Sequence, residues 1–260
     1  MTGARDSYFD ELERFYTVTD IAVWQRVLGP QLHYHNGFFP EGDETLEEAT
    51  CLAVRSLYDD VQPGASLLDA GCGWGGPLAM LVEEHGCRGQ GITISQSQRD
   101  YCTNLGLSVH RANLESFVPE GRFDACLLLE SLEHIRDKRR LFRVLSGHCD
   151  TLLLRTNCTA RVDRAFHPHT VPPGYMFLET PGMILGHLEA TGWRVERSED
   201  RRPLAVMSNK HWLERLQSEF PMQEPPGHLG VLYRQVSHAE KNPEAWAAAN
   251  PLLEVVASRR

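Results

Sequence analysis

From residue 66 onward, short apolar runs alternate with longer segments in which apolar residues recur every three or four positions. Short apolar runs are typical of buried strands, and the longer period is typical of amphipathic helices. The runs predict strands at 66–70, 89–94, 108–111, 123–129, 151–154, 193–197 and 229–236. The segments between them predict helices at 77–85, 97–105, 138–145, 181–191 and 211–220. This alternation predicts an α/β fold with a doubly wound, seven-stranded and mostly parallel sheet, which binds ligands where its strands end.

The residues before this alternation follow another pattern. Residues 7–28 predict one or two amphipathic helices, residues 31–43 predict a loop, and a capping box at Thr45 predicts a helix to about residue 58. We therefore expect a helical cap with a substrate-closing loop at 1–60 and a catalytic domain at 61–240. Lid insertions are expected at 159–185 and 204–226. The remaining residues, 241–260, are expected to form a tail with an exposed helix from residue 243.

Composition narrows the class of protein. The chain has 260 residues, of which 42% are hydrophobic and 23% charged, as in an ordinary globular domain. It has no apolar run long enough to span a membrane, and its start does not resemble a signal peptide. The net charge of −9 disfavours nucleic-acid binding, and the Arg pairs at 139–140, 201–202 and 259–260 are interpreted as solvated faces. We expect a small-molecule partner, without nucleic acid or membrane.

The cysteines indicate the compartment. Their number, seven, is odd, and no two are spaced as C-x-x-C. Such cysteines are typical of reduced thiols rather than of disulfides or zinc ligands, which predicts a cytoplasmic protein. The oligomeric state stays open, with a homodimer as one option.

A glycine-rich loop follows the first predicted strand. Its sequence is LLDAGCGWGG at 67–76, between an apolar strand and a helix that begins with Pro77. Glycines let a ligand lie against the backbone, and the helix start offers free N–H groups. The loop lacks the Gly-Lys-Ser/Thr of a phosphate-binding loop and the spacing of a dinucleotide motif.

Five motifs in order resemble the class I S-adenosylmethionine (SAM)-dependent methyltransferases. They are similar to the branch that contains cyclopropane fatty acid synthases and the tocopherol-type and sterol-type C-methyltransferases. The motifs are HYHNGFF at 33–39, DAGCGWG at 69–75, GITIS at 91–95 with Gln98, ANLESF at 112–117 and ESLEHI at 130–135. The resemblance implies a Rossmann-like fold and SAM as the cofactor.

The resemblance also implies roles for individual residues. Gly71 and Gly73 would let the methionine part of SAM approach the backbone, and Asp69 would order the loop. Thr93, Ser95 and Gln98 would serve the ribose, although many class I members have an acidic residue at the position of Thr93. Asn113 and Leu114 would face adenine, the alternative being a turn and the core. The expected cofactor-binding residues are Asp69, Gly71, Cys72, Gly73, Thr93, Ile94, Gln98, Asn113, Leu114 and Glu130.

Candidate catalytic residues follow the fourth predicted strand. Glu130, Glu133 and His134 are expected to act as acid, base or cation-stabilising groups, because they lie at the ligand edge of the sheet. The alternative is glutamates at a helix start that face water. Tyr34 and His35 are expected to close over the sulfonium and the acceptor, the alternative being a loop packed on the core.

Two positions depart from the cyclopropane synthases. In those enzymes a Cys of the N-terminal motif and a His after the fifth strand help to hold a bicarbonate base, and here the aligned residues are Asn36 and Arg155. This difference argues against bicarbonate-dependent cyclopropanation of a lipid. Arg155 would either grip an anionic group of the substrate or form a salt bridge with Glu130 or another acid.

Two histidine pairs are weighed as metal ligands. His33 and His35, and likewise His167 and His169, would lie on one face of an extended backbone. No Cys or Asp completes a local ligand pattern, so we predict no metal site.

The sequence favours a methyltransferase that acts on a small, partly apolar metabolite. Methylation of carbon and a place in specialised metabolism are favoured. The alternatives are a SAM enzyme that cyclises, cleaves SAM or rearranges its substrate, and a non-catalytic SAM-binding scaffold. The predicted lid and substrate wall contains Phe166, Tyr175, Met176, Phe177, Met183, Met207, Trp212, Phe220 and Met222. Such residues favour an apolar pocket.

Overall fold

A single seven-stranded sheet organises the chain. The computed structural model describes residues 7–161 and 176–260. The strand order is β3-β2-β1-β4-β5-β7-β6. The strands are β1 (Ser66–Ala70), β2 (Arg88–Thr93), β3 (Ser108–Arg111), β4 (Phe123–Leu129), β5 (Cys149–Asn157), β6 (Trp193–Asp200) and β7 (Leu252–Arg259). Strands β1–β5 pair in parallel, whereas β7 is antiparallel to both β5 and β6. The predicted fold class is confirmed.

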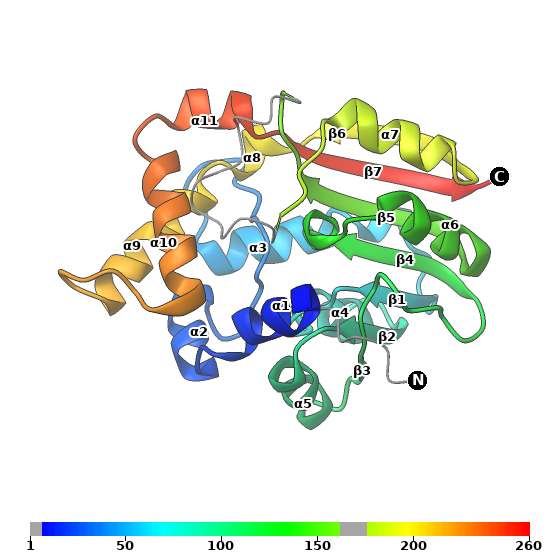
Figure 1. The fold of residues 1–260 in the computed structure, drawn as a ribbon, viewed down its shortest axis with the longest axis horizontal. Helices are drawn as coiled ribbons and strands as arrows, with labels where there is room; N and C mark the ends of the chain where they lie inside the picture. The colour runs from blue at the N-terminus through cyan, green and yellow to red at the C-terminus, as the bar shows by residue number, and fades with distance from the viewer. Residues whose placement is uncertain (1–6, 162–175) are drawn as a thin grey trace.

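Helices cover both faces of the sheet (Figure 1). The helices up to the fourth strand are α1 (Ser7–Thr17), α2 (Ile21–Leu28), α3 (Leu46–Arg55), α4 (Gly76–Glu83) and α5 (Gln96–Asn104). Those that follow are α6 (Lys138–His148), α7 (Pro181–Glu189), α8 (Arg202–Ala205), α9 (Ser208–Glu219), α10 (Gly227–Ala239) and α11 (Pro243–Ala249). Side chains of α3 and α4 form the core on one face, and side chains of α6 and α7 form it on the other. None of the described helices is both long and apolar enough to cross a membrane.

A helical cap covers the carboxyl ends of the parallel strands. The arrows of β4 and β5 point toward the side where α1, α2, α9 and α10 gather (Figure 1). Trp24, Trp212 and Leu229 share one buried cluster with the loop before α3. Because strand order reverses between β1 and β4, a crevice forms at this edge, where doubly wound folds bind ligands. The cap closes that crevice.

Two predicted elements are wrong. Residues 229–236 form part of helix α10 rather than a strand. Leu229, Leu232 and Val236 are all buried and recur at helical spacing, so the apolar run records a buried helix face. The tail does contain helix α11, but residues 252–259 form β7, which is almost wholly buried between β5 and β6. The sequence predicts an exposed tail because β7 pairs with strands that lie far away in the chain, and no local pattern indicates this pairing.

Several predictions lie partly outside the described residues. The lid expected at 159–185 includes residues 162–175, and with them Phe166, His167, His169 and Tyr175. The second expected lid, 204–226, spans the end of α8 and all of α9. The capping box at Thr45 is present in full at the start of α3.

Candidate active site

A cavity of about 720 Å³ lies between the sheet edge and the helical cap. The expected catalytic and cofactor-binding residues that line it are Tyr34, His35, Asp69, Gly71, Cys72, Gly73, Thr93, Ile94, Gln98, Asn113, Leu114, Glu130, Glu133 and His134. Ser95, also expected at the ribose, does not border the cavity, because it is fully buried and its hydroxyl accepts the backbone N–H of Gln98 at the start of α5. We call the part formed by Asp69, Gly71, Cys72, Gly73, Thr93, Ile94, Gln98, Asn113 and Leu114 the glycine-loop wall. We call the part formed by Asn36, Glu130, Glu133, Asn157 and Arg202 the carboxylate wall. All of these residues border one space.

The glycine loop offers open backbone to the cavity. Gly71 and Gly73 have φ angles of 97° and 53°, in the left-handed region that favours glycine. A Cβ on Gly71 would collide with the side chain of Ser131, whereas a Cβ on Gly73 would meet no atom within 4 Å. The space at Gly73 is therefore cavity that a side chain would fill, as a cradle for a bound ligand requires.

Asp69 lies at the floor of this wall. Its side chain is buried, and burial raises the pKa of its carboxyl group to about 7. One oxygen, Oδ2, has no hydrogen-bond partner among the described residues. A buried acceptor of this kind fits a ligand that donates a hydrogen bond, because an unpaired buried polar group is costly. These features of Gly73 and Asp69 fit a bound SAM.

The ends of β2 and β3 present polar groups in fixed orientations. The hydroxyl of Thr93 donates to Oε1 of Gln98 at 2.6 Å, which leaves the Gln98 amide nitrogen as a donor. Oδ1 of Asn113 accepts the backbone N–H of Glu115 at 2.7 Å and forms a tight turn, as the alternative interpretation of Asn113 expected. Leu114 borders the cavity and also packs against the core.

Glu130 lies where β4 ends and the chain turns sharply. Its φ of 48° is unusual for a residue other than glycine. Its carboxylate accepts the backbone N–H of Asn36 at 2.9 Å and the Asn36 side-chain amide at 2.6 Å. The side-chain amide of Asn157 donates to it at 3.3 Å. Backbone strain of this kind is found where a side chain must be aimed at a site.

Glu133 lies one turn further on and is buried. Oε1 accepts the backbone N–H of Asn157 at 2.6 Å and its side-chain amide at 2.8 Å. Oε2 has no hydrogen-bond partner among the described residues. Burial, with the negative charge of Glu130 adding to it, raises the pKa of Glu133 to about 7. The alternative of a water-facing helix-start glutamate is therefore wrong for Glu133, which is 2% exposed.

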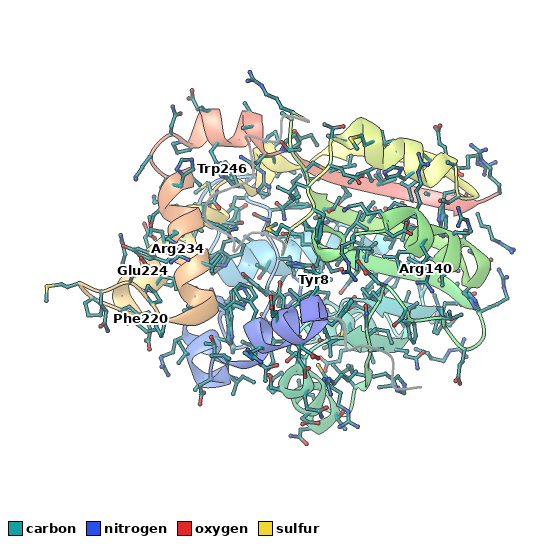
Figure 2. All side chains as sticks on the ribbon, viewed as in Figure 1. Tyr8, Arg140, Phe220, Glu224, Arg234 and Trp246 are labelled. Atoms are coloured by element: carbon teal, nitrogen blue, oxygen red, sulfur yellow. The ribbon has the colours of Figure 1, made fainter. Side chains whose placement is uncertain are left out.

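Arg202 completes the carboxylate wall, against the prediction that the pair 201–202 is a solvated face. Its guanidinium is 1% exposed and donates to the amide oxygens of Asn36 at 3.2 Å and Asn157 at 2.5 Å. Trp246 of α11, labelled in Figure 2, lies 4.6 Å from it. Arg201 and Arg202 have different surroundings because consecutive side chains point in different directions. Arg201 forms ion pairs with Glu199 and Glu254 instead.

Tyrosine and histidine side chains also line the cavity. The Tyr16 hydroxyl lies 2.7 Å from Nε2 of His134, and the hydroxyl of Tyr8, on helix α1 in Figure 2, donates to the His134 carbonyl at 2.8 Å. The Tyr34 hydroxyl lies 2.9 Å from Nε2 of His228. Burial lowers the pKa of His228 to about 3, so its ring is neutral. Tyr34 and His228 thus present uncharged aromatic rings to the cavity.

His35 is engaged within the protein. Its Nε2 lies 2.9 Å from Nδ1 of His33, and its Nδ1 lies 3.0 Å from the carbonyl of Asn36. Burial lowers the pKa of His35 to about 4. These contacts favour the alternative of a loop packed on the core. Within residues 7–161 and 176–260, no cluster of three potential metal ligands is found.

Arg155 does not reach the cavity. It is fully buried and forms an ion pair with Glu254 of β7, so the prediction that it could grip a substrate anion is wrong and the salt-bridge alternative is confirmed. Asn36, the other departure from the cyclopropane synthases, is held between Glu130 and Arg202.

Four residues of the site were missed by sequence reasoning. Asn157 is the last residue of β5, and this place at a strand end was a usable signal, whereas Arg202 follows β6 as one of two adjacent arginines and its sequence gives no sign of burial. Tyr16 and His228 lie on cap helices far apart in the chain. Nothing in their local sequence distinguishes them from ordinary surface or core residues.

Comparisons with known proteins identify the family of the chain. A family model described as mycolic acid cyclopropane synthetase matches residues 4–223. The hydroxymycolate synthase MmaA4 of Mycobacterium tuberculosis is 26% identical over 242 residues, covering 81% of this chain and 79% of that protein. The SAM-dependent methyltransferase UmaA of the same species is 37% identical over 98 residues, covering 36% of this chain and 33% of that protein.

Solved structures share the fold over nearly the whole chain. The cyclopropane synthase MmaA2 from M. tuberculosis superposes with a TM-score of 0.82 at 20% identity, covering 96% of this chain and 98% of that one. Coclaurine N-methyltransferase bound to N-methylheliamine and SAH superposes with a TM-score of 0.79 at 19% identity, covering 99% of this chain and 88% of that one. The chain therefore belongs to the mycolic acid cyclopropane synthetase family of SAM-dependent methyltransferases, and SAM is its cofactor.

Proposed function

We propose that the protein methylates a carbon atom of a small, partly apolar metabolite in specialised metabolism, with Glu133 as the general base. The observation that carries this proposal is the Glu133 carboxyl group. It borders the cavity, it is held by Asn157, and one of its oxygens has no partner among the described residues. Its pKa of about 7 suits proton transfer near neutral pH.

The glycine-loop wall would hold the cofactor. Gly71 and Gly73 would receive the methionine part, Gln98 would donate to the ribose, and Leu114 would pack on adenine. Bound SAM supplies an electrophilic methyl group. The chain itself contributes alignment of the acceptor, which can supply roughly 7–11 kcal/mol of the barrier.

The carboxylate wall would handle the acceptor proton. Glu133, in its ionised form, would take a proton from the acceptor through Oε2. His134, held by Tyr16 at 2.7 Å, lies beside it and would orient the acceptor. The apolar and aromatic lining, including Phe15, Tyr34 and Trp212, would exclude water and bind the apolar part of the acceptor.

The contacts of Asn36 and Arg155 argue against a bicarbonate base. Asn36 is held by Glu130 and Arg202, and Arg155 by Glu254. Neither is free to bind an anion in the cavity. A side-chain base is the simpler solution, and it favours methyl transfer over lipid cyclopropanation. The seven cysteines are all free and buried, which supports a cytoplasmic setting.

The first experiment is calorimetric titration with SAM and with S-adenosylhomocysteine (SAH), followed by product analysis on a panel of apolar metabolites. Micromolar binding of both and release of SAH with a carbon-methylated product would support the proposal. Release of methylthioadenosine would show attack elsewhere on the cofactor, and conversion of a metabolite without SAH would show a rearrangement. Binding without any product on a broad panel would favour a scaffold.

A further inference from the structure

Two asparagines connect one buried guanidinium to two carboxyl groups. Oδ1 of Asn36 accepts from Arg202 at 3.2 Å, and its amide nitrogen donates to Glu130 at 2.6 Å. Oδ1 of Asn157 accepts from Arg202 at 2.5 Å, and its amide nitrogen donates to Glu133 at 2.8 Å and to Glu130 at 3.3 Å. Each asparagine thus uses its oxygen on the cation and its nitrogen on the acids.

In this arrangement each asparagine amide can have only one orientation. A guanidinium has donors and no acceptor, whereas an ionised carboxylate has acceptors and no donor. An asparagine amide between them must turn its oxygen to the arginine and its nitrogen to the glutamate. Without Arg202, only the glutamates themselves would orient the two amides.

Arg202 is itself held firmly. Its Nε donates to the carbonyl of Asn250 at 2.7 Å, and its backbone N–H donates to Asp200 at 2.9 Å. No carboxylate among residues 7–161 and 176–260 forms a direct ion pair with it. Glu130 is the charged residue with which it interacts most strongly, followed by Asp200, and the two asparagines connect it to Glu130 by hydrogen bonds.

We propose that Arg202 is the positioning residue of the carboxylate wall, and that it fixes the orientation of Asn36 and Asn157 so that both present N–H groups to Glu130 and Glu133. Arg202 touches neither cofactor nor acceptor in this role. It acts through the asparagines, and its charge favours the ionised state of Glu133. The inference rests on the proposed function in so far as Glu133 is the base.

Other charged or titratable groups also face Glu133, from several elements. They are Glu130 after β4, Tyr16 of α1, Lys138 of α6, Cys158 after β5 and Arg202 of α8. The Lys138 ammonium group is held by the carbonyls of Ile135 at 2.8 Å and Phe177 at 2.6 Å. Arg202 is the cation that reaches Glu133 through a shared hydrogen-bond partner, so its removal should act on Glu133 most directly.

The test follows the protonation of Glu133 without any acceptor, by infrared difference spectroscopy of the purified full chain across pH. The carbonyl stretch of protonated carboxyl groups should disappear with a midpoint near pH 7, and Glu133→Gln should remove the Glu133 component of that band and leave the component of Asp69. Arg202→Gln should raise the midpoint by about one pH unit, because a nearby positive charge and correctly turned amides are lost. Arg202→Lys keeps the positive charge, so it should raise the midpoint by less than Arg202→Gln does.

Controls separate this role from a general effect on the fold. Arg201→Lys changes the neighbouring arginine, which pairs with Glu199 and Glu254, and should leave the midpoint unchanged. Calorimetric binding of SAH should persist in every variant. If Arg202→Gln does not fold, Asn157→Leu removes one bridge and should also raise the midpoint.

The outcomes distinguish the two proposals. If Glu133→Gln removes no infrared band, Glu133 is not a base that titrates near neutral pH. This result would overturn the proposed function. A band assigned to Glu133 whose midpoint is the same in the wild type and in the folded Arg202 and Asn157 variants would overturn the positioning role of Arg202 alone.

Discussion

The two walls of the cavity are built in different ways. The glycine-loop wall comes from residues at or shortly after the carboxyl ends of β1, β2 and β3, three neighbouring strands of the sheet. The carboxylate wall combines the loop before α3 with residues at or after the ends of β4, β5 and β6. Its central contacts join residues up to 166 positions apart in the chain, as between Asn36 and Arg202.

The difference separates cofactor binding from acceptor chemistry within one molecule. Backbone and short local motifs suffice to receive a cofactor that is always the same. An acceptor site must instead be assembled from side chains that the whole fold brings together. We therefore expect substitutions on the glycine-loop wall to change cofactor binding, and substitutions on the carboxylate wall to change turnover.

The largest effect is expected on the carboxylate wall. Glu133→Gln keeps the shape of the side chain but removes the base, so kcat should fall by about 10²–10⁴-fold. Affinity for SAM in calorimetry should change by less than about twofold, because Glu133 lies apart from the glycine loop. A turnover equal to that of the wild type would remove Glu133 from the chemistry.

The next effect concerns stability rather than activity. Arg155→Met leaves Glu254 as a buried carboxylate with one of its two arginine partners lost, and breaking such a pair costs roughly 3–5 kcal/mol of unfolding free energy. The matched control is Arg55→Met, which breaks an exposed pair with Glu84 and should cost no more than about 1 kcal/mol. Urea denaturation measures both. Equal costs would contradict a structural role for the buried pair.

A third change addresses the glycine-loop wall. Gly73→Val places a branched side chain in the open space of the cavity and strains a φ of 53°, so affinity for SAM should fall by at least about 100-fold. Gly106→Val is the control, because Gly106 has a φ of 82° and open surroundings but does not border the cavity. Calorimetry should show near-normal binding for this control and little for Gly73→Val.

The smallest effect is a pH dependence of stability. The pKa of Glu133 is raised from 4.5 in the unfolded chain to about 7 in the fold, so the folded state binds the proton more tightly. Its contribution to stability is complete below about pH 4.5 and is lost as the pH rises toward 7. Glu133→Gln should therefore be more stable than the wild type at pH 8, by roughly 1–3 kcal/mol, and this gain should shrink at pH 5. Thermal unfolding at the two pH values measures the difference, and a gain independent of pH would contradict it.

The same contrast explains how much could be predicted from sequence. The glycine loop, Thr93, Gln98, Asn113 and Leu114 follow predicted strands, and all of them border the cavity. Arg202 was misread because its sequence neighbour is another arginine, and burial depends on residues far away in the chain. No local pattern distinguishes a solvated arginine from one held by Asn36 and Asn157.

The sheet was predicted best where strands pair with nearby strands. The run at 229–236 was misread because a helix face buried in the cap is as apolar as a strand. β7 was missed since its partners β5 and β6 come much earlier in the chain. The physical reason is the same in both cases, because tertiary contacts rather than local preference decide the structure.

The position of β7 also has a consequence for how the chain folds. β5 pairs with β7 over residues about one hundred positions apart, from Thr151 with Ser258 to Asn157 with Leu252. Pairings this distant close large loops and form slowly. On the ribosome, β1–β5 emerge well before Glu254, so Arg155 waits without its carboxylate until β7 has been made. Completion of the sheet is therefore expected as a late step of folding, and the carboxylate wall above it as the last part of the site to become rigid.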